Sequence, residues 1–238
     1  LFTFPTGENR GIPSAPTPRD YERAFDRYPS AQAALVTSPD YFGRTADVRG
    51  IKDVCERRGK LLIVDAAHGA HFASRPDIFP CGGEKYADFA VLSAHKTLRA
   101  MTQSAIGAVN DERYFAAYDD ALELIGTTSP SYRLLASLEN AIEFEEENAD
   151  GYDALNAACR RLKERINCLG ADDPMRITVD CDGYGTTGER LYYECVKRGV
   201  VPETFFGRYC VFIVTLSDEP SAVDELGKTL GEILTGKE

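Results

Sequence analysis

The chain has 238 residues, 43% of them hydrophobic, which is enough to bury a core in one large domain or in two smaller ones. Its net charge of -11 argues against nucleic acid and against an anionic membrane surface as partners. The seven Cys form no CxxC pair, and the three His lack metal-ligand spacings, so the composition indicates a cytoplasmic protein with reduced thiols and no metal site. No apolar run approaches membrane-spanning length, and no signal peptide is visible.

The first half of the chain alternates between helical and strand patterns. Residues 1–20 are rich in Pro and Gly and are expected to form an extended or looped segment. Short apolar runs rich in β-branched residues predict buried strands, and a strand–helix–strand order predicts a parallel unit with a right-handed crossover. The expected elements are helices over Asp20–Tyr28 and Asp47–Arg58, and strands over Ala33–Thr37, Leu61–Asp65, Phe89–Ser93 and Ser104–Val109.

The second half begins with three helical patterns and then changes character. The acidic run Glu143–Glu147 is expected to be a solvated helix face. Beyond Asp172 short strands and helices alternate, which predicts a small α+β unit. We therefore expect a large α/β domain over residues 1–150 and a small carboxyl-terminal domain over residues 151–238. The expected helices are Glu112–Ile125, Pro130–Asn148, Tyr152–Leu169, Arg190–Lys197 and Ala222–Leu234, and the expected strands are Ile177–Val179 and Tyr209–Leu216.

Chemically active side chains follow two neighbouring strands at the point where each strand ends. Asp65 closes the strand Leu61–Asp65, and Lys96 comes shortly after Ser93. Ligands of open α/β sheets bind outside the carboxyl ends of the strands, so these side chains are expected to share one crevice. Lys96 comes after a buried strand and is therefore expected to be partly buried, which allows its amine to act as a nucleophile. The carboxylate of Asp65 can pair with a protonated heteroaromatic nitrogen, as pyridoxal phosphate requires. Taken singly, Lys96 is also compatible with a surface lysine, and Asp65 with a helix cap or a structural ion pair.

The residues around these two complete the pattern. Ala67 is small enough for an aromatic ring to lie against it, and His68 can donate a hydrogen bond to a ring oxygen. Ser93 and His95 are natural phosphate ligands beside a turn. D-x-A-H at one strand end and S-x-H-K at the next together indicate a cofactor site.

Four segments carry a family resemblance: TSPDYFG, VDAAHGAHF, LSAHKTLRAMTQSAIGAV and TTSPSYRLLASLENA. They resemble the ornithine/lysine/arginine decarboxylases, which are pyridoxal-phosphate enzymes of fold type I. The resemblance is strong over residues 33–140 and weaker beyond, where YGTTGERLYYECVKRGVVPE resembles the family's small domain. It implies a mostly parallel sheet flanked by helices, a basic amino acid as substrate, and a homodimer that shares its active sites.

The resemblance also implies residue roles. Lys96 would form the Schiff base with the cofactor, Asp65 would pair with the pyridine nitrogen, and His68 would lie near the phenolic oxygen. Ser93 and His95 would bind the phosphate. Thr128 and Ser129 would contact the phosphate of the neighbouring subunit. Ala67 would pack on the cofactor ring, and Tyr41 would lie on the substrate side of the pocket.

The sequence departs from the family pattern in two places. Ala66 stands where many relatives have Glu. The chain also begins at Leu1 without the family's earlier phosphate-binding turn and ring-stacking His. We expect from this that a preceding part of the large domain is missing from this sequence.

Two other functions remain open at the sequence level. The same fold supports aminotransferases and other lyases, for which Arg208 could bind a substrate carboxylate. A non-catalytic homologue that regulates or dimerises with an intact partner is the other possibility. The decarboxylase hypothesis is the leading one, because the strand-end residues occur together with the family-like segment TSPSY.

Overall fold

The computed structural model describes residues 8–9, 11–80 and 82–236, and the chain folds into two compact units. The first unit comprises Leu1–Ala73 and Cys81–Glu143, and the second comprises Ser74–Pro80 and Phe144–Glu238. The division thus falls inside a helix, Tyr132–Asn148, rather than at the expected position 150. None of the described helices combines the length and the apolar character that crossing a bilayer requires.

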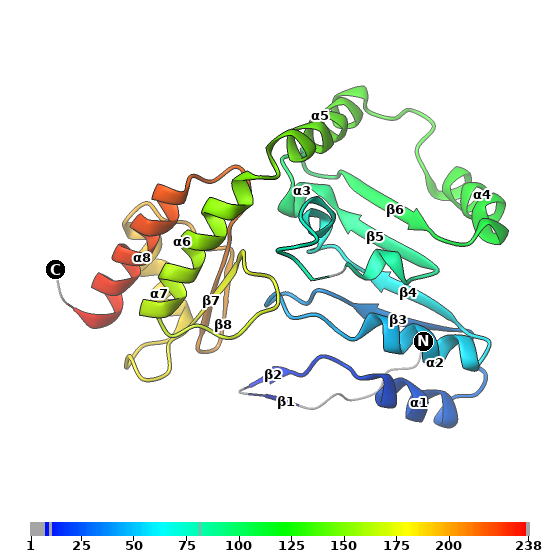
Figure 1. The fold of residues 1–238 in the computed structure, drawn as a ribbon, viewed down its shortest axis with the longest axis horizontal. Helices are drawn as coiled ribbons and strands as arrows, with labels where there is room; N and C mark the ends of the chain where they lie inside the picture. The colour runs from blue at the N-terminus through cyan, green and yellow to red at the C-terminus, as the bar shows by residue number, and fades with distance from the viewer. Residues whose placement is uncertain (1–7, 10, 81, 237–238) are drawn as a thin grey trace. The chain divides into compact units, whose positions relative to one another are not determined.

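The first unit is built around a four-stranded sheet in the order β3-β4-β5-β6 (Figure 1). β3, β4 and β5 are parallel, and β6 runs antiparallel to β5, so the expected mostly parallel sheet is confirmed. The elements of this unit are β1 (Glu8–Asn9), β2 (Ile12–Pro13), α1 (Pro18–Arg27), β3 (Ala33–Thr37), α2 (Val48–Arg57), β4 (Leu61–Asp65), the 3₁₀ turn η2 (Gly83–Lys85), β5 (Phe89–Ser93), α3 (Ala94–Thr97), β6 (Ala105–Val109), η3 (Glu112–Tyr114) and α4 (Phe115–Ile125). The 3₁₀ turn η1 (Ala70–Ser74) and helix α5 (Tyr132–Asn148) begin in this unit and end in the second.

Helix α2 shows how the sequence sets one side of this unit. The Asp47 side chain caps its amino terminus by accepting a hydrogen bond from the Gly50 N–H. Its apolar stripe is buried against Leu62 and Val64 of β4 in one core cluster. Because alternate strand residues point to opposite faces, this packing covers only one face of the sheet.

The second unit is a three-stranded antiparallel sheet in the order β7-β9-β8 with helices packed beside it (Figure 1). Its elements are α6 (Gly151–Arg165), β7 (Arg176–Asp180), α7 (Gly188–Lys197), β8 (Thr204–Phe206), β9 (Tyr209–Ile213) and α8 (Pro220–Thr235). Helices α6 and α8 lie side by side. The expected α+β character of this region is confirmed.

Three expectations for local structure were wrong. The helix expected to reach Leu169 ends at Arg165, because Ile166 is extended and the Leu169 N–H donates to the Thr178 carbonyl. Strand β8 was not expected. Within the acidic run, Glu145 is buried and accepts hydrogen bonds from the hydroxyls of Ser74 and Tyr152, so its burial is compensated.

Candidate active site

Strands β4 and β5 bring their carboxyl ends to the same edge of the sheet. They are parallel neighbours, with Asp65 of β4 opposite Val91 of β5. Asp65 is therefore the last residue of one strand, and Ser93 is the last residue of the next. The expectation that these two strand ends are neighbours is confirmed, and this edge is the candidate site.

Lys96 lies in the single helical turn α3 that follows β5. Ala94 and Thr97 of this turn are buried, and the Ala94 N–H donates to the Ser104 carbonyl, which ties the turn to the start of β6. The Lys96 side chain is exposed, contrary to the partial burial that the sequence suggested. Its Nζ stands 3.4 Å from Nε2 of His68, so the structure brings together the amine and one of the imidazoles that the sequence selected.

His68 is buried in the turn after β4 and is held there by close packing. The next residue, Gly69, donates its N–H to the Ala66 carbonyl. A Cβ at position 69 would lie 2.8 Å from Cδ of Pro39, so only glycine allows this approach to the loop after β3. That loop also carries Tyr41, whose ring meets the His68 ring edge-on with centroids 4.8 Å apart. Tyr41 thus lies beside His68 in the candidate site.

Among the described residues, one carboxylate oxygen of Asp65 accepts a local hydrogen bond and the other has no hydrogen-bond partner. Its Oδ1 accepts a hydrogen bond of 3.1 Å from the N–H of Ala67, which fixes the orientation of the carboxylate. Within the described part of the chain, no ion pair joins Asp65 to Lys96. Both Asp65 and Ala67 are half-buried, so each remains accessible to a ligand from one side.

His95 is anchored by a contact that the sequence did not reveal. Its Nδ1 lies 2.9 Å from the Ser104 carbonyl oxygen. A carbonyl oxygen only accepts, so Nδ1 carries the proton and Nε2 faces away from this anchor. Ser104 could have been suspected from its position as a polar residue directly before a strand. The half-buried Ser93 makes no side-chain hydrogen bond within the described residues.

Thr128 and Ser129 are not brought together with the strand-end residues. They lie in the exposed connection between α4 and α5. Within the described residues, the Ser129 N–H donates to Oγ1 of Thr127, and neither residue contacts Lys96 or His68. Their expected role concerns a neighbouring subunit, which this single chain does not contain.

Arg208, which could bind a substrate carboxylate in an aminotransferase, already has its charge neutralised. Its guanidinium forms ion pairs with Asp180 and, at 3.1 Å, with Asp182, and the hydrogen bond with Asp180 raises the pKa of Arg208. A cation shared by two carboxylates is poorly suited to bind a third.

Comparison with known proteins identifies the family of the chain. The family model described as Orn/Lys/Arg decarboxylase, major domain, matches residues 6–168, and the chain belongs to this family. The family resemblance stated from the sequence is thereby confirmed.

Individual relatives give the same result. The chain is 29% identical to the arginine decarboxylase of Bacillus subtilis over 259 residues, covering 98% of this chain and 52% of that protein. It is also 29% identical over 246 residues to the arginine decarboxylase of Halalkalibacterium halodurans, covering 94% of this chain and 49% of that protein. The chain thus spans about half the length of these curated relatives.

Two solved structures share the fold. The SepCysS–SepCysE N-terminal domain complex matches 98% of this chain and 68% of its own chain, with a TM-score of 0.73 and 15% identity. The Francisella novicida lysine decarboxylase LdcF matches 91% of this chain and 39% of its own chain, with a TM-score of 0.67 and 16% identity. The expected fold class is therefore confirmed.

Proposed function

We propose that this chain carries the cofactor-binding residues of a pyridoxal-phosphate-dependent decarboxylase that acts on a basic amino acid: ornithine, lysine or arginine. The observation that carries the proposal is the 3.4 Å approach of Lys96 Nζ to His68 Nε2, at the strand end next to Asp65. Family membership and the arginine decarboxylases among the relatives support the reaction class.

The groups at the strand ends suit pyridoxal phosphate. Lys96 offers an exposed amine for the cofactor's carbonyl carbon, and Asp65 offers a carboxylate oxygen without a protein partner among the described residues. Ala67 leaves room for a flat ring between strand end and solvent, and Ser93 has an available hydroxyl for a phosphate. When bound, the cofactor accepts the electron pair that is left when carbon dioxide departs.

The protein's own residues would hold and move protons around that chemistry. Asp65, fixed by the Ala67 N–H, would keep a proton on the ring nitrogen, as an anion beside a cation does. His68 can exchange a proton with Lys96, because their nitrogens already face each other. With Nδ1 donating to Ser104, His95 can donate to a phosphate only through a protonated Nε2.

Tyr41 is our candidate for the substrate side of the site. Its ring packs on His68 while its side chain stays partly accessible. An aromatic wall beside Lys96 would restrict how the substrate turns and so help to align the bond that breaks. The net charge of -11 favours a cationic substrate by long-range attraction.

We also propose a homodimer in which Thr128 and Ser129 reach the partner's phosphate site. Both lie in an exposed segment flanked by strongly exposed apolar side chains, those of Leu124, Ile125 and Tyr132. An apolar cluster of this kind is typical of an interaction surface. Ile125→Asp is expected to convert a dimer to a monomer in analytical ultracentrifugation, whereas Val201→Asp, at an exposed residue of the second unit, is not. A cytoplasmic location is also proposed, because the described cysteines are all free thiols.

Product analysis tests the reaction. The purified protein is incubated with pyridoxal phosphate and each of the three carboxyl-labelled basic amino acids, and labelled carbon dioxide, amine and keto acid are measured. Release of carbon dioxide with an equal amount of amine, lost in Lys96→Ala, is the expected result. Keto acid without carbon dioxide would identify an aminotransferase, and release that persists in Lys96→Ala would refute the assigned lysine.

A further inference from the structure

The loop that follows β3 folds back on itself around one carboxylate. Asp40 Oδ1 accepts hydrogen bonds of 2.9 Å from the N–H groups of Phe42 and Arg44, and the Asp40 N–H donates to the Arg44 carbonyl at 2.8 Å. A side-chain oxygen that accepts a hydrogen bond from the amide two residues further on closes a tight turn. The Phe42 N–H belongs to the peptide group that follows Tyr41, so this turn fixes the backbone that carries Tyr41.

The guanidinium of Arg44 binds the same carboxylate. Its Nε lies 2.7 Å from Asp40 Oδ2, and a second guanidinium nitrogen donates to the same oxygen. The side chains of Arg44 and Asp40 are only 17% and 24% exposed, so solvent screens this ion pair less than a pair on the open surface. Arg44 also donates to the Pro13 carbonyl at 2.6 Å, which joins the loop to the amino-terminal segment.

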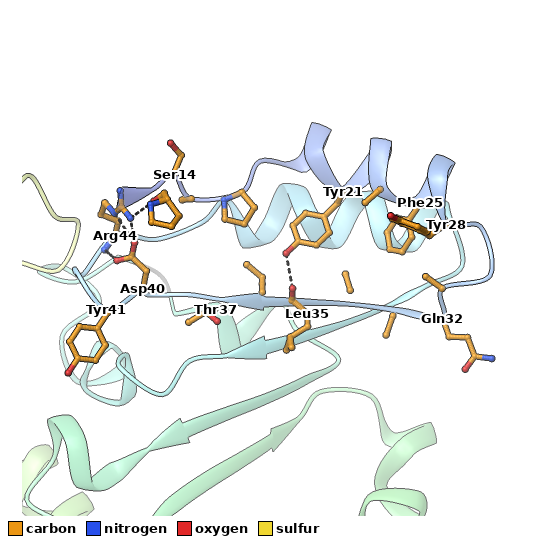
Figure 2. A pocket seen from close by; sticks show the side chains of 18 of the residues that line it. Ser14, Tyr21, Phe25, Tyr28, Gln32, Leu35, Thr37, Asp40, Tyr41 and Arg44 are labelled. Carbon is orange, nitrogen blue, oxygen red and sulfur yellow. Dashed lines mark hydrogen bonds and ion pairs between the residues drawn. The ribbon is translucent and has the colours of Figure 1, made fainter. Parts of the chain in front are cut away.

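Tyr41 connects this loop to the candidate active site. Figure 2 shows Asp40 and Arg44 at one end of a groove of about 850 Å³ lined by β3 and α1, with the Tyr41 ring pointing away from the ion pair. That ring meets the His68 ring with centroids 4.8 Å apart, and His68 Nε2 stands 3.4 Å from Lys96 Nζ. A displacement of the loop would therefore move the aromatic ring that packs on the imidazole beside Lys96.

We propose that Asp40 and Arg44 are positioning residues for Tyr41. Their ion pair keeps the loop closed, and the closed loop holds the Tyr41 ring against His68 as a fixed wall beside Lys96. Both carboxylate oxygens of Asp40 already accept hydrogen bonds, so Asp40 supports this wall and does not serve as a ligand for the substrate's cationic group. The inference rests on the proposed function only for the place of Tyr41 on the substrate side.

Nuclear magnetic resonance of the cofactor-free chain tests the positioning. In protein labelled at its three His, the ring protons of His68 sense the ring current of Tyr41, and Tyr41→Leu gives their resonance without that ring. We expect Arg44→Met to move the His68 resonance most of the way to its position in Tyr41→Leu. Arg113→Met removes the same charge from another Arg–Asp pair of the first unit and should leave the resonance in place.

Kinetics of the cofactor-loaded protein test the consequence for the substrate. With ornithine, lysine and arginine as probes, Arg44→Met should lower kcat/KM for the best of the three by about tenfold, because a displaced wall aligns the substrate poorly. The affinity for pyridoxal phosphate, measured by visible absorption, should stay unchanged. Asp40→Asn keeps an acceptor for the Phe42 N–H, so it should lower kcat/KM less than Asp40→Ala does.

The two measurements separate failure of this inference from failure of the proposed function. A His68 resonance that keeps its wild-type position in Arg44→Met, or that moves equally in Arg113→Met, would overturn the positioning role. If Arg44→Met does not fold, the milder Asp40→Asn decides, and it should shift the resonance in the same direction. The expected shift without decarboxylation in the wild type would refute the proposed function and support the positioning of Tyr41. Equal losses of kcat/KM in Arg44→Met and Arg113→Met would trace the effect to net charge and overturn the proposal.

Discussion

Asp88 is the residue whose removal should most clearly expose how the sheet is held together. It precedes β5, is buried, and accepts a 2.7 Å hydrogen bond from the Leu62 N–H of β4. Its other oxygen accepts a 2.7 Å hydrogen bond from Nζ of Lys52 in α2. Burial lowers the pKa of Lys52, but the hydrogen bond and the charge of Asp88 outweigh burial and raise it. One carboxylate therefore joins β4, β5 and α2.

The expected cost of Asp88→Ala is about 3 kcal/mol in the free energy of unfolding. About 2 kcal/mol comes from a buried Leu62 N–H without a partner. About 1 kcal/mol comes from Lys52, whose side chain is 19% exposed and can turn to Glu56, 3.5 Å away, so its loss is reduced by solvent. Asp88→Asn keeps an acceptor for Leu62 and should cost only about 1 kcal/mol.

Urea unfolding monitored by circular dichroism measures these differences in the free energy of unfolding. The control is Asp53→Asn, at an exposed acidic residue of α2, the helix that carries Lys52. The control should change stability by less than about 0.5 kcal/mol. Equal destabilisation by Asp88→Ala and Asp88→Asn would refute the role of the Leu62 hydrogen bond. Wild-type stability in both would refute the whole argument.

Two further predictions concern stability. Gly188→Ala should lower the free energy of unfolding by about 1–3 kcal/mol, because a Cβ there would overlap the Tyr209 backbone. Gly231→Ala in α8 should raise it by about 0.5–1 kcal/mol, because a Cβ there meets no atom within 4 Å. Equal shifts in the melting temperatures of the two variants would contradict this. Burial raises the pKa of the Cys55 thiol from 9.0 to about 11, so the native state keeps a proton that the unfolded state loses, and stability should fall as the pH rises from about 9 to 11. Cys55→Ala should make this fall shallower in urea titrations at alkaline pH, and an unchanged slope would refute the assignment.

The sequence predicts well those strands in which buried and exposed side chains alternate regularly. The strands at Leu61–Asp65 and Phe89–Ser93 alternate between a covered and an uncovered face, and their short apolar runs are too short for helices. The turn at Ile166–Leu169 was not predictable in the same way, since its apolar residues continue the helical spacing of α6. Pairing with Thr178, which is distant in the chain, decides its extended form.

Burial of charge likewise depends on partners that a sequence does not reveal. Glu145 lies in a run of acidic residues, a pattern that predicts a solvated side chain. In the structure it is buried, and the hydroxyls of Ser74 and Tyr152 donate hydrogen bonds to its carboxylate. Ser74 is far from Glu145 in the chain, so no local pattern indicates this contact. Strand β8 follows Pro202 and is only three residues long, which leaves too little periodicity to detect.

The candidate site shows the same limit. Asp65 and Lys96 could be chosen because Asp65 ends one strand and Lys96 comes shortly after the next, and the carboxyl ends of parallel strands meet at one edge. The 3.4 Å approach of Lys96 to His68 and the anchoring of His95 by the Ser104 carbonyl depend on the path of two turns. Those paths are set by packing, such as Gly69 against Pro39, and not by spacing along the chain.

The central claim is that Lys96 is the lysine to which pyridoxal phosphate attaches. The most direct test is to mix the purified protein with pyridoxal phosphate and record the visible absorption spectrum. The mixture is then reduced with borohydride, and the lysine that carries the cofactor is located by mass spectrometry. Lys96→Ala and Lys197→Ala are treated in parallel, the second at a surface lysine paired with Glu194. We predict a visible absorption band and label on Lys96 in the wild type and in Lys197→Ala, and neither in Lys96→Ala. A band that survives in Lys96→Ala, or no label on Lys96 in the wild type, would contradict the claim.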